Sequence, residues 1–370
     1  MRIAINCRSI LLPRRTGIGR YTYHLVDSLG QMNTSDDYVL YARKKLFDPK
    51  RRMPSFPYPN FKKVQDIFGL GPKRLFKKVS VYHVPHPDMV EPLPGVKLIV
   101  TIHDLIYKTH PQSHTPATVD TTAKQMAAVV EHADRIICVS QSTRADLHRF
   151  FDLPQHKTCV VHNGVDHGVF YPLDDVQRKE AALRLPALGI HKPFLLFVGT
   201  IEPRKNLIGL LKSFALLKSS KAFLGQLVVV GMQGWMMQSL TPLIKELGLG
   251  DDIVFAGFIS DGQLHDLYNL TEVFVFPSFY EGFGFPMVEA FCCGAPVVAS
   301  NTSSCGEIGK GAAIMIDPQD PQAMAHALAE ILQDDRLRQK MRLDSLAQAQ
   351  KFSFLKTAQE TRAIYYQSCD

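Results

Sequence analysis

The sequence lacks several features that would assign a chain to a class at once. No stretch reaches the roughly 18 uninterrupted apolar residues of a membrane-spanning helix. The start, Met-Arg-Ile-Ala-Ile-Asn, has no long apolar core of the kind that a secretion signal requires. The 7 cysteines include no Cys-x-x-Cys spacing, and several lie in apolar runs where a thiol acts as a small hydrophobe. These absences favour a protein of the reducing cytoplasm that is neither secreted through such a signal nor membrane-spanning.

Composition and periodicity predict an α/β protein of two domains. The chain has 370 residues, about twice the usual size of one domain, with 46% apolar and 21% charged residues. Short β-branched runs alternate with helical patterns, which is typical of parallel sheets covered by helices on both faces. In the first half we expect strands near 2–7, 37–42, 80–84, 97–102, 134–139 and 157–161, and helices near 18–30, 115–132 and 141–150.

A second series of the same kind follows, so we expect two tandem doubly wound, Rossmann-like domains with a cleft between them and ligands outside the carboxyl ends of the strands. The second series has strands near 193–199, 226–231, 252–256, 272–276 and 295–299, and helices near 205–218, 236–247, 261–269, 286–293, 320–333 and 335–350. The expected boundaries are an N-terminal domain at 1–165, an interdomain linker at 166–192 that opens after the turn or hinge Asn163-Gly164, a C-terminal domain at 193–350, and a C-terminal helix at 351–370 that crosses back to the N-terminal domain.

The net charge of +7 is concentrated in residues 1–170, which carry 24 Lys and Arg against 14 Asp and Glu, so the remainder of the chain is net negative. The densest stretch is 41–78, where basic residues are interleaved with aromatic ones. Such a segment suits an anionic membrane surface or a lipid-phosphate acceptor, and the alternative is a solvated mobile loop. Nothing that resembles a recognition helix or a base-stacking motif accompanies the charge, so no nucleic-acid partner is predicted.

The run from Val273 to Glu289 is the most informative part of the sequence. A buried strand leads into the glycine-bearing loop Glu281-Gly-Phe-Gly-Phe-Pro286, and Pro286 suits the first turn of a helix that contains Glu289. Both carboxylates would then face one crevice. Glycines in the loop let the backbone approach a ligand and offer N–H groups to anionic oxygens. The simpler interpretation of the acidic residues is a helix start in which they complement the macrodipole.

This Glu-x7-Glu run resembles the hallmark of retaining glycosyltransferases of family 4, which adopt the GT-B fold, and the resemblance covers nearly the whole chain. It implies that Glu281 contacts hydroxyls of the donor sugar and that Glu289 holds the nucleotide ribose. It also implies that the amides of the loop between them lie against the sugar and the phosphates, a set that comprises Gly282, Phe283, Gly284 and Phe285.

A second run, Gly199-Thr200-Ile-Glu202-Pro-Arg204-Lys205-Asn206, follows a strand and is expected to open a helix started by Pro203. Cations at a helix N-terminus oppose the macrodipole, so Arg204 and Lys205 there call for an external anion, and a diphosphate would supply it. The alternative is a pair of solvent-exposed cations. The run resembles the Arg/Lys pair of family 4, which neutralises charge on the departing nucleoside diphosphate. By the same resemblance Gly199, Thr200 and Gly231 would line the nucleotide.

No Asp-x-Asp pair occurs in the sequence. A glycosyltransferase that holds its donor through Mg²⁺ or Mn²⁺ normally needs such oxygen ligands. We therefore expect no metal and no cofactor, with fixed cations and helix ends doing that work. The spacing of His83 and His86 looks at first like that of metal ligands, but no set of Cys, His or acidic partners accompanies it.

In the first domain, Arg14-Arg15-Thr16-Gly17-Ile18-Gly19 follows the first strand and opens a helix. A lone Gly-x-Gly is a weak signal, and the third glycine and the acidic residue of a dinucleotide fingerprint are missing. Family 4 enzymes carry a glycine loop here whose amides touch the donor phosphate, so Gly17 and Ile18 are candidates for that contact, although a simple tight turn is an open alternative. Arg14 and Arg15 are candidates on the acceptor side.

His103 and Asp104 end another predicted strand. A buried histidine satisfied by its neighbour is the usual interpretation of such a pair. The resemblance instead places His103 beside the donor sugar, as a catalytic or donor-positioning residue, with Asp104 orienting its ring. Ser140 follows the next strand, where it is expected first to cap a helix and secondarily to touch the acceptor.

Together these features predict a retaining hexosyltransferase with a nucleotide-sugar donor and a lipid-linked or oligosaccharide acceptor. Close resemblance to bacterial mannosyltransferases of lipopolysaccharide or exopolysaccharide assembly, carried also by Gly231-Met-Gln-Gly-Trp235, favours mannose from GDP-mannose. The protein would be cytoplasmic, with peripheral binding to the inner face of the membrane through 41–78. The open alternatives are a UDP-sugar donor, a sugar-nucleotide epimerase of the same fold, a glycoside hydrolase with a carboxylate pair, and a carbohydrate-binding protein with an inactive site.

Overall fold

The computed structural model describes most of the chain and divides it into two compact units. Unit 1 comprises residues 1–164 and 353–370, and unit 2 comprises residues 165–352. The ranges described are 1–12, 17–32, 34–44, 48, 51–88, 90–232 and 237–369, with the backbone alone at 237–239. Arg14, Arg15 and Trp235, with Lys45, Phe47 and Lys50 of the basic stretch, lie outside them.

Unit 1 is built on a parallel seven-stranded sheet in the order β3-β2-β1-β4-β5-β6-β7. The sequence predicted six of these strands, and it missed β3 because that strand lies inside the basic stretch 41–78. The strands are β1 (Arg2–Asn6), β2 (Asp37–Arg43), β3 (Phe61–Asp66), β4 (Val81–Val84), β5 (Lys97–Ile102), β6 (Arg135–Cys138) and β7 (Thr158–Val160). The helices are α1 (Gly17–Gln31), α2 (Pro72–Leu75), α3 (Ile106–Thr109), α4 (Pro116–His132), α5 (Gln141–Phe150) and α14 (Phe354–Gln367).

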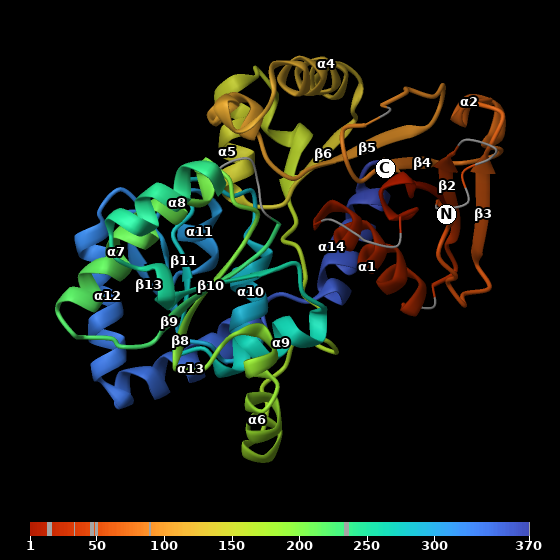
Figure 1. The fold of residues 1–370 in the computed structure, drawn as a ribbon. Helices are drawn as coiled ribbons and strands as arrows, with labels where there is room; N and C mark the ends of the chain where they lie inside the picture. Colours follow the sequence, from red (N-terminus) through yellow and green to blue (C-terminus); the bar gives the residue numbers. More distant parts are fainter. Residues whose placement is uncertain are drawn as a thin grey trace. The chain divides into compact units, whose positions relative to one another are not determined.

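Helices cover the two faces of this sheet separately. Apolar side chains of β4 and β5 pack on α4, through residues such as Val100, Met126 and Val129. On the other side α14, the last helix of the chain, lies beside α1 although the two are far apart in the sequence (Figure 1). Gly164 and the backbone of Ser353–Phe354 lie so close that a Cβ at Gly164 would meet the Phe354 nitrogen at 2.1 Å, so only glycine fits there.

Asp36 ties α14 to the start of β2. Its buried carboxylate accepts hydrogen bonds from Arg362 Nε at 2.6 Å and from the Tyr366 hydroxyl at 2.6 Å. Burial alone would raise the pKa of Asp36, but hydrogen bonds from Tyr366, the α-amino group and Arg362 hold that pKa below its usual range. A carboxyl whose pKa is lower in the folded state stabilises the fold above its unfolded pKa of about 3.9, and this stabilisation is lost as the pH falls through the folded value.

Replacing Asp36 with Asn is therefore expected to lower the free energy of unfolding by about 2–3 kcal/mol at pH 7, because a partner of a buried charged network is removed. Urea denaturation of the full chain measures the loss. The matched control is Asp37→Asn at the exposed neighbouring position, which should change stability by no more than about 0.5 kcal/mol. Equal losses in the two variants would refute this role for Asp36.

The described aromatic residues of the stretch 41–78 contradict one of the two interpretations offered for it, the solvated mobile loop. Most of its described aromatic rings pack against the unit: Phe56 is buried, and Phe61 and Phe76 make edge contacts with Tyr38 and Tyr41. The ring of Tyr58 lies on α1, where a Cβ at Gly30 would meet it at 2.1 Å. The described part is therefore no solvated loop. Of its aromatic residues, Phe68 alone is strongly exposed, at 75%.

Unit 2 holds a second parallel sheet, six-stranded, in the order β10-β9-β8-β11-β12-β13. Five of its strands lie where the sequence predicted them, and β13 was not predicted. The strands are β8 (Phe194–Val198), β9 (Gln226–Val230), β10 (Ile253–Gly257), β11 (Val273–Phe276), β12 (Val297–Ser300) and β13 (Ala313–Ile316). The helices are α6 (Asp175–Ala182), α7 (Leu207–Ser219), α8 (Met237–Glu246), α9 (Asp261–Leu270), α10 (Phe285–Cys292), α11 (Ser303–Ile308), α12 (Pro321–Gln333) and α13 (Asp335–Ala349).

Alternate residues of these strands pack on opposite layers of helices. Leu195 and Phe197 of β8 join the core formed with α7 and α12, which lie together in Figure 1, whereas Phe274 of β11 contacts Tyr268 of α9. The segment 166–192, expected as a linker, belongs to unit 2 and contains α6. Arg184 of this segment pairs with Asp266 of α9 at 2.7 Å, so the segment is fastened to the unit.

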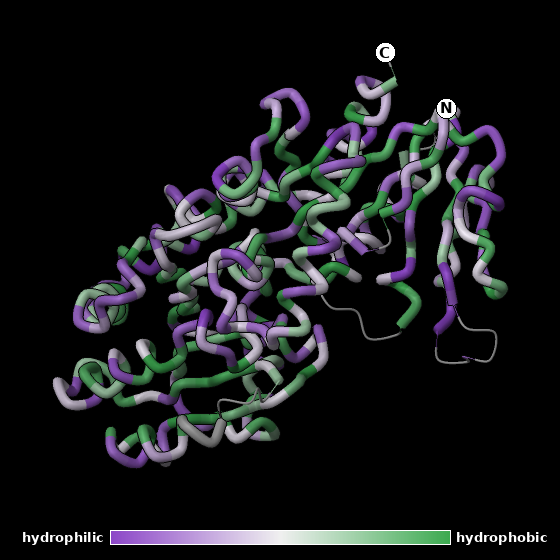
Figure 2. The backbone as a smooth tube through the Cα atoms, turned by 90° about the horizontal axis from the view of Figure 1, so that it is seen from above, coloured by the Kyte–Doolittle hydropathy of each residue, from purple (hydrophilic) through white to green (hydrophobic). Residues whose placement is uncertain are grey.

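Hydrophobic and hydrophilic stretches alternate along the backbone of each unit (Figure 2). In the part of the chain that the structure describes, no helix has the length and apolar character needed to cross a membrane.

Candidate functional site

The strand order of unit 2 reverses between β8 and β11, because the chain runs outward from β8 through β9 and then returns to β11 on the other side. Ligands of doubly wound sheets bind in the crevice outside the carboxyl ends of the strands at such a switch point. Both motifs predicted from the sequence follow these two strands: Arg204 and Lys205 come after β8, and Glu281 comes after β11. The fold therefore brings together side chains that are 76 residues apart.

The two cations lie in a 3₁₀ turn, Pro203–Lys205, and not in the first turn of the helix as expected. Asn206 adopts the left-handed conformation, with φ 56°, and its side chain accepts a hydrogen bond from the Gly209 N–H at 3.2 Å. This cap starts α7 at Leu207. The cations therefore precede α7 and are held by neighbouring carboxylates, so they do not oppose the macrodipole from within its first turn.

Glu281 is the counterion of both cations. Its Oε1 accepts a hydrogen bond from Lys205 Nζ, and its Oε2 lies 2.9 Å from Arg204 Nη1. Arg204 also lies 2.5 Å from Glu202 through its second terminal nitrogen, and the carbonyl of Tyr280 accepts from its Nη1 at 3.2 Å. Two cations and two carboxylates thus form one cluster whose formal charges cancel.

Most of this cluster is withdrawn from water. Lys205 is 6% exposed and Glu281 is 7% exposed. Burial lowers the pKa of Lys205 and outweighs the raising effect of Glu281. Burial alone would raise the pKa of Glu281, but the charges of Lys205 and Arg204 lower it below its usual range. In this water-poor setting electrostatic interactions are stronger than at the surface, so an anion that reaches the cluster would interact strongly with the cations.

Hydroxyl groups at the start of α11 fix the loop that carries Glu281. Ser303 Oγ accepts from the Glu281 N–H at 3.0 Å, and the hydroxyls of Ser304 and Thr302 donate to the carbonyls of Glu281 and Phe279, each at 2.9 Å. The sequence analysis missed these residues, as it missed Glu202. The signal in the sequence was the hydroxyl-rich run Thr302-Ser-Ser304, which follows β12 after Asn301.

Glu289 lies on α10 and is 5% exposed, and its Oε2 accepts a hydrogen bond from the Tyr268 hydroxyl at 3.1 Å. The N-cap of α10 is Gly284, with φ 97°, and no side chain caps this end. Pro286 has no N–H to offer, so the first amides of the helix come from the glycine loop. Phe283 is buried and packs edge-on against Phe285, and this contact helps to fix the loop.

Gly199 and Gly231 lie together where β8 and β9 end. A Cβ at Gly231, which has φ 145°, would meet the Gly199 carbonyl oxygen at 2.0 Å, so this position needs glycine. The methylene carbons of Lys205 lie 3.4 Å from the place where a Cβ of Gly199 would be. The half-buried Thr200 follows directly. These residues form the wall of the site on the β8 side.

In unit 1, His103 lies at the end of β5 and is half-buried, and its Nε2 is 2.8 Å from the carbonyl oxygen of Pro85. Since a carbonyl only accepts, Nε2 carries the proton and Nδ1 holds a lone pair in the neutral ring. Burial lowers the pKa of His103 to about 4. The Pro85 carbonyl and an edge contact with Tyr21 hold the ring. Oδ1 of Asp104 accepts a hydrogen bond from the Ile106 N–H at 3.1 Å.

The remaining predicted residues of unit 1 are placed as follows. Gly17 is exposed and starts α1, and Ile18 lines a cavity beside β1 and β4. Ser140 accepts from the Thr143 N–H at 3.0 Å and caps α5, as the first interpretation expected. It is fully buried, which leaves no surface for an acceptor. Within the described ranges, no three His, Cys, Asp or Glu side chains are grouped so that they could hold a metal ion.

Two family models match the chain. Residues 15–169 match the model described as Glycosyltransferase Family 4, and residues 186–345 match the model described as Glycosyl transferases group 1. Each model covers most of one unit, and together they include every residue of the charge cluster.

Curated proteins from Escherichia coli are similar over long stretches. The O-antigen chain mannosyltransferase B is 29% identical, over 95% of this chain and 96% of that protein. The serotype-specific mannosyltransferase WbdA is 30% identical over 62% of this chain, but the match covers only 28% of that longer protein.

Solved structures agree on the architecture. Sucrose-phosphate synthase from Thermosynechococcus elongatus has a TM-score of 0.78 at 22% identity, covering 99% of this chain and 98% of that one. Anabaena HepE in complex with UDP-glucose has a TM-score of 0.75 at 16% identity, covering 99% and 100%. These similarities confirm the predicted GT-B fold class, an α/β protein with two parallel sheets in tandem.

Proposed function

This chain belongs to the glycosyltransferases of family 4 and group 1, and from that membership we propose that it transfers a hexose from a nucleoside diphosphate sugar to a hydroxyl of a glycan acceptor. The charge cluster of Arg204, Lys205 and Glu281 at the switch point of unit 2 is the observation that carries the proposal. In it, the buried carboxylate of Glu281, at the start of the glycine loop that leads into α10, holds two cations in place.

The cations would bind the donor diphosphate and stabilise the negative charge that grows on it as the glycosidic bond breaks. Such preorganised stabilisation is most effective where water is excluded, and the burial of Lys205 meets this condition. Amides of the loop from Gly282 to Phe285 would add hydrogen bonds to the phosphates. No side chain of the cluster is needed as a proton acceptor, because the leaving phosphate can take the acceptor proton. We therefore propose a metal-independent transfer with retention of configuration.

Glu281 would have two tasks in this scheme. Its carboxylate holds both cations in place, and an ionised carboxylate has about four lone-pair sites, so further sites remain for hydroxyls of the donor sugar. The carboxylate of Glu289, which accepts a hydrogen bond from the Tyr268 hydroxyl, would also accept hydrogen bonds from the ribose hydroxyls. Neutral His103 would offer its Nδ1 lone pair to a hydroxyl.

For the donor we propose GDP-mannose, on the similarity to the two mannosyltransferases. Two apolar side chains stand exposed at the carboxyl edge of the unit 2 sheet: Met232 after β9 at 61% and Phe258 after β10 at 68%. A flat nucleobase is a chemically suitable cover for such side chains. We propose that these two side chains contact the nucleobase of the donor, a contact that was not predicted from the sequence.

The acceptor would be a lipid-linked glycan of bacterial surface polysaccharide or lipopolysaccharide assembly. The basic stretch supports peripheral contact with an anionic membrane, but on a narrower surface than the sequence predicted. Phe68 at 75% and Leu70 at 42% are the exposed apolar residues of its described part, and the exposed cations Lys73 and Arg74 follow them. Such binding would be peripheral and salt-dependent.

A panel of GDP- and UDP-linked sugars tests the proposal, scored by thermal stabilisation of the protein and by slow hydrolysis of the donor. GDP-mannose at about 100 times its dissociation constant should stabilise the fold by about 2.7 kcal/mol, and the other sugars less. Release of GDP should accelerate when a glycan acceptor is added. Formation of a free epimer from the donor alone would point to the epimerase. If no sugar of the panel stabilises the protein or is hydrolysed, the proposal is rejected.

A further inference from the structure

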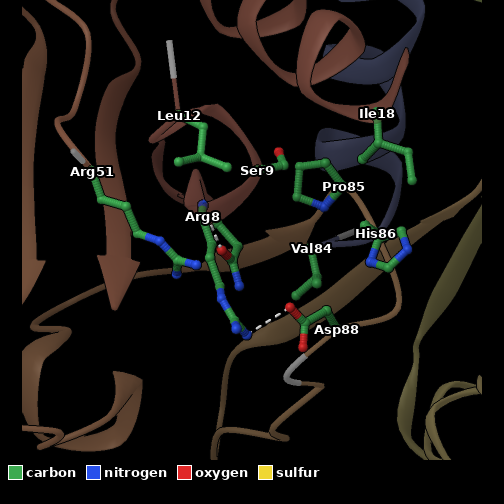
Figure 3. A pocket seen from close by; sticks show the side chains of 10 residues that line it. Arg8, Ser9, Leu12, Ile18, Arg51, Val84, Pro85, His86 and Asp88 are labelled. Atoms are coloured by element: carbon green, nitrogen blue, oxygen red, sulfur yellow. Dashed lines mark hydrogen bonds and ion pairs between the residues drawn. The ribbon is translucent and has the colours of Figure 1, made fainter. Parts of the chain in front are cut away.

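Unit 1 has its own switch point, because its strand order reverses between β1 and β4. A cavity of about 250 Å³ opens at this point, outside the carboxyl ends of the two strands. It is lined on one side by Asn6, the last residue of β1, and by Arg8 and Ser9 after that strand. On the other side it is lined by Pro85, His86 and Asp88 after β4 (Figure 3). None of these residues belongs to the charge cluster of unit 2.

A second cavity of about 520 Å³ adjoins the first, since Arg8 and Arg51 line both. It is bounded by Arg43 and Lys44 at the end of β2 and by Phe68 after β3. Among the described lining residues of the two cavities, Arg8, Arg43, Lys44 and Arg51 are basic and Asp88 is acidic. The electrostatic field where the cavities meet therefore favours an anion.

The basic side chains are positioned by specific contacts. Arg8 pairs with Asp88 at 2.7 Å, and Arg51 lies 3.3 Å from Asp48 and extends toward Arg8 (Figure 3). Lys44 Nζ donates to the Arg51 carbonyl at 3.4 Å. The loop that bears Phe68 is fixed by Asp66, which accepts from the Leu70 and Gly71 amides, each at 2.9 Å.

The lining changes in character along the two cavities. The first offers Asn6, Ser9 and His86 as polar groups beside the apolar Val84 and Ile18, a mixture suited to a sugar ring. Arg8 and Arg51 stand between the cavities, and Phe68 bounds the second with an exposed apolar ring. A ligand that matches this order has a sugar, then an anionic group, then an apolar part.

We propose that these cavities bind a glycosyl phosphate or diphosphate, with its sugar at the switch point and its phosphate between Arg8 and Arg51. The role of this ligand as the acceptor rests on the function proposed above, whereas its binding does not. The apolar part of a lipid-linked form would lie against Phe68. His103 fixes one wall of the first cavity, because its ring donates a hydrogen bond to the carbonyl of Pro85, which lines that cavity.

The test is calorimetric titration of the full chain with a hexose 1-phosphate, with a methyl hexoside as the uncharged probe. We expect the hexose 1-phosphate to bind at least about tenfold more tightly than the methyl hexoside, and Arg51→Gln to weaken it by about tenfold or more. Asp88→Asn should tighten it about two- to fivefold, since a carboxylate that competes for Arg8 becomes neutral. If Asp88 had a purely structural role, its replacement would not tighten the binding of hexose 1-phosphate.

Lys62→Ala is the matched control, because Lys62 is an exposed cation of the same basic stretch that lines neither cavity. The affinity of Lys62→Ala for hexose 1-phosphate should stay within about twofold of that of the wild type. Equal losses in Lys62→Ala and Arg51→Gln would indicate diffuse attraction to anionic surfaces and overturn the proposal, as would weaker binding by Asp88→Asn. A polyprenyl-phosphate-linked sugar in detergent separates the two sources of the ligand: Phe68→Ser should weaken this form and leave hexose 1-phosphate unaffected.

Titration of GDP-mannose into the same variants separates the two proposals. We expect Arg51→Gln to bind GDP-mannose as the wild type does. If the wild type binds no nucleotide sugar while the hexose 1-phosphate results hold, the proposed function fails and this site stands. If nucleotide sugar binds but hexose 1-phosphate does not respond to Arg51→Gln, this site fails and the proposed function stands.

Discussion

Replacing Lys205 with Met is expected to lower the rate of glycosyl transfer by about 10² to 10³, equivalent to about 2.7–4 kcal/mol of transition-state stabilisation. Met fills similar space without the charge, so Arg204 remains paired with Glu281 while the leaving diphosphate loses its buried cation. Because the charge on the diphosphate grows as the bond breaks, kcat should fall by more than KM rises. Steady-state kinetics with GDP-mannose and a glycan acceptor measure both.

The control is Lys212→Met, where an exposed lysine of α7, the helix that follows the two cations, is replaced in the same way. It should transfer at close to the wild-type rate. If Lys205→Met keeps more than about a tenth of the wild-type kcat, the electrostatic account of catalysis is wrong.

Glu281→Gln is expected to separate binding from transfer. The amide keeps the shape of the side chain but leaves Arg204 and Lys205 with Glu202 as their remaining carboxylate partner in the cluster. Transfer should fall by about 10² because the cations and the donor sugar are no longer held in register. Affinity for GDP should be unchanged or up to about tenfold tighter, since a competing negative charge has been removed.

The stability of Glu281→Gln should also depend on whether GDP is bound. Loss of a buried partner should lower the free energy of unfolding of Glu281→Gln by up to about 3–5 kcal/mol, and bound GDP should restore more stability in this variant than in the wild type. Thermal unfolding with and without GDP gives both values. Glu246→Gln at an exposed position of α8 serves as the control. A variant that loses GDP binding along with transfer would show that Glu281 acts mainly on the nucleotide, against the present assignment.

Much of the fold follows from the sequence because strands and helices of doubly wound sheets have strong local signals. Buried runs such as Phe194–Val198 and Val273–Phe276 are apolar throughout, and each is followed by glycine or proline. The prediction failed where local and tertiary signals differ. β3 contains Lys62 and Lys63, which point to a loop, yet as an edge strand it pairs along its full length with β2.

The site was predicted as a set of residues but not as an arrangement. The positions of Arg204 and Lys205 after one apolar strand, and of Glu281 after another, could be predicted from the order of the elements. Their mutual pairing could not, because it depends on the 3₁₀ turn and on Asn206 in the left-handed conformation. The role of Ser303 depends on the return of the chain through β12, a contact that no local pattern records.

The contacts of His103 likewise depend on a neighbouring strand. The role of Asp104 in orienting the His103 ring stays a prediction, whereas the contact of the ring with the Pro85 carbonyl at the neighbouring strand end could not be predicted. Neighbours across a sheet are invisible in the sequence until the strand order is known, and here β4 and β5 are paired.

Equilibrium binding of GDP-mannose in the presence of a metal chelator tests the central claim most directly. It compares the wild type with Lys205→Met and Lys212→Met, and it requires no knowledge of the acceptor. If the buried cations hold the diphosphate, the wild type and Lys212→Met bind GDP-mannose without metal, and Lys205→Met binds it at least about tenfold more weakly. Absence of binding to the wild type, or equal affinity in all three proteins, would contradict the central claim.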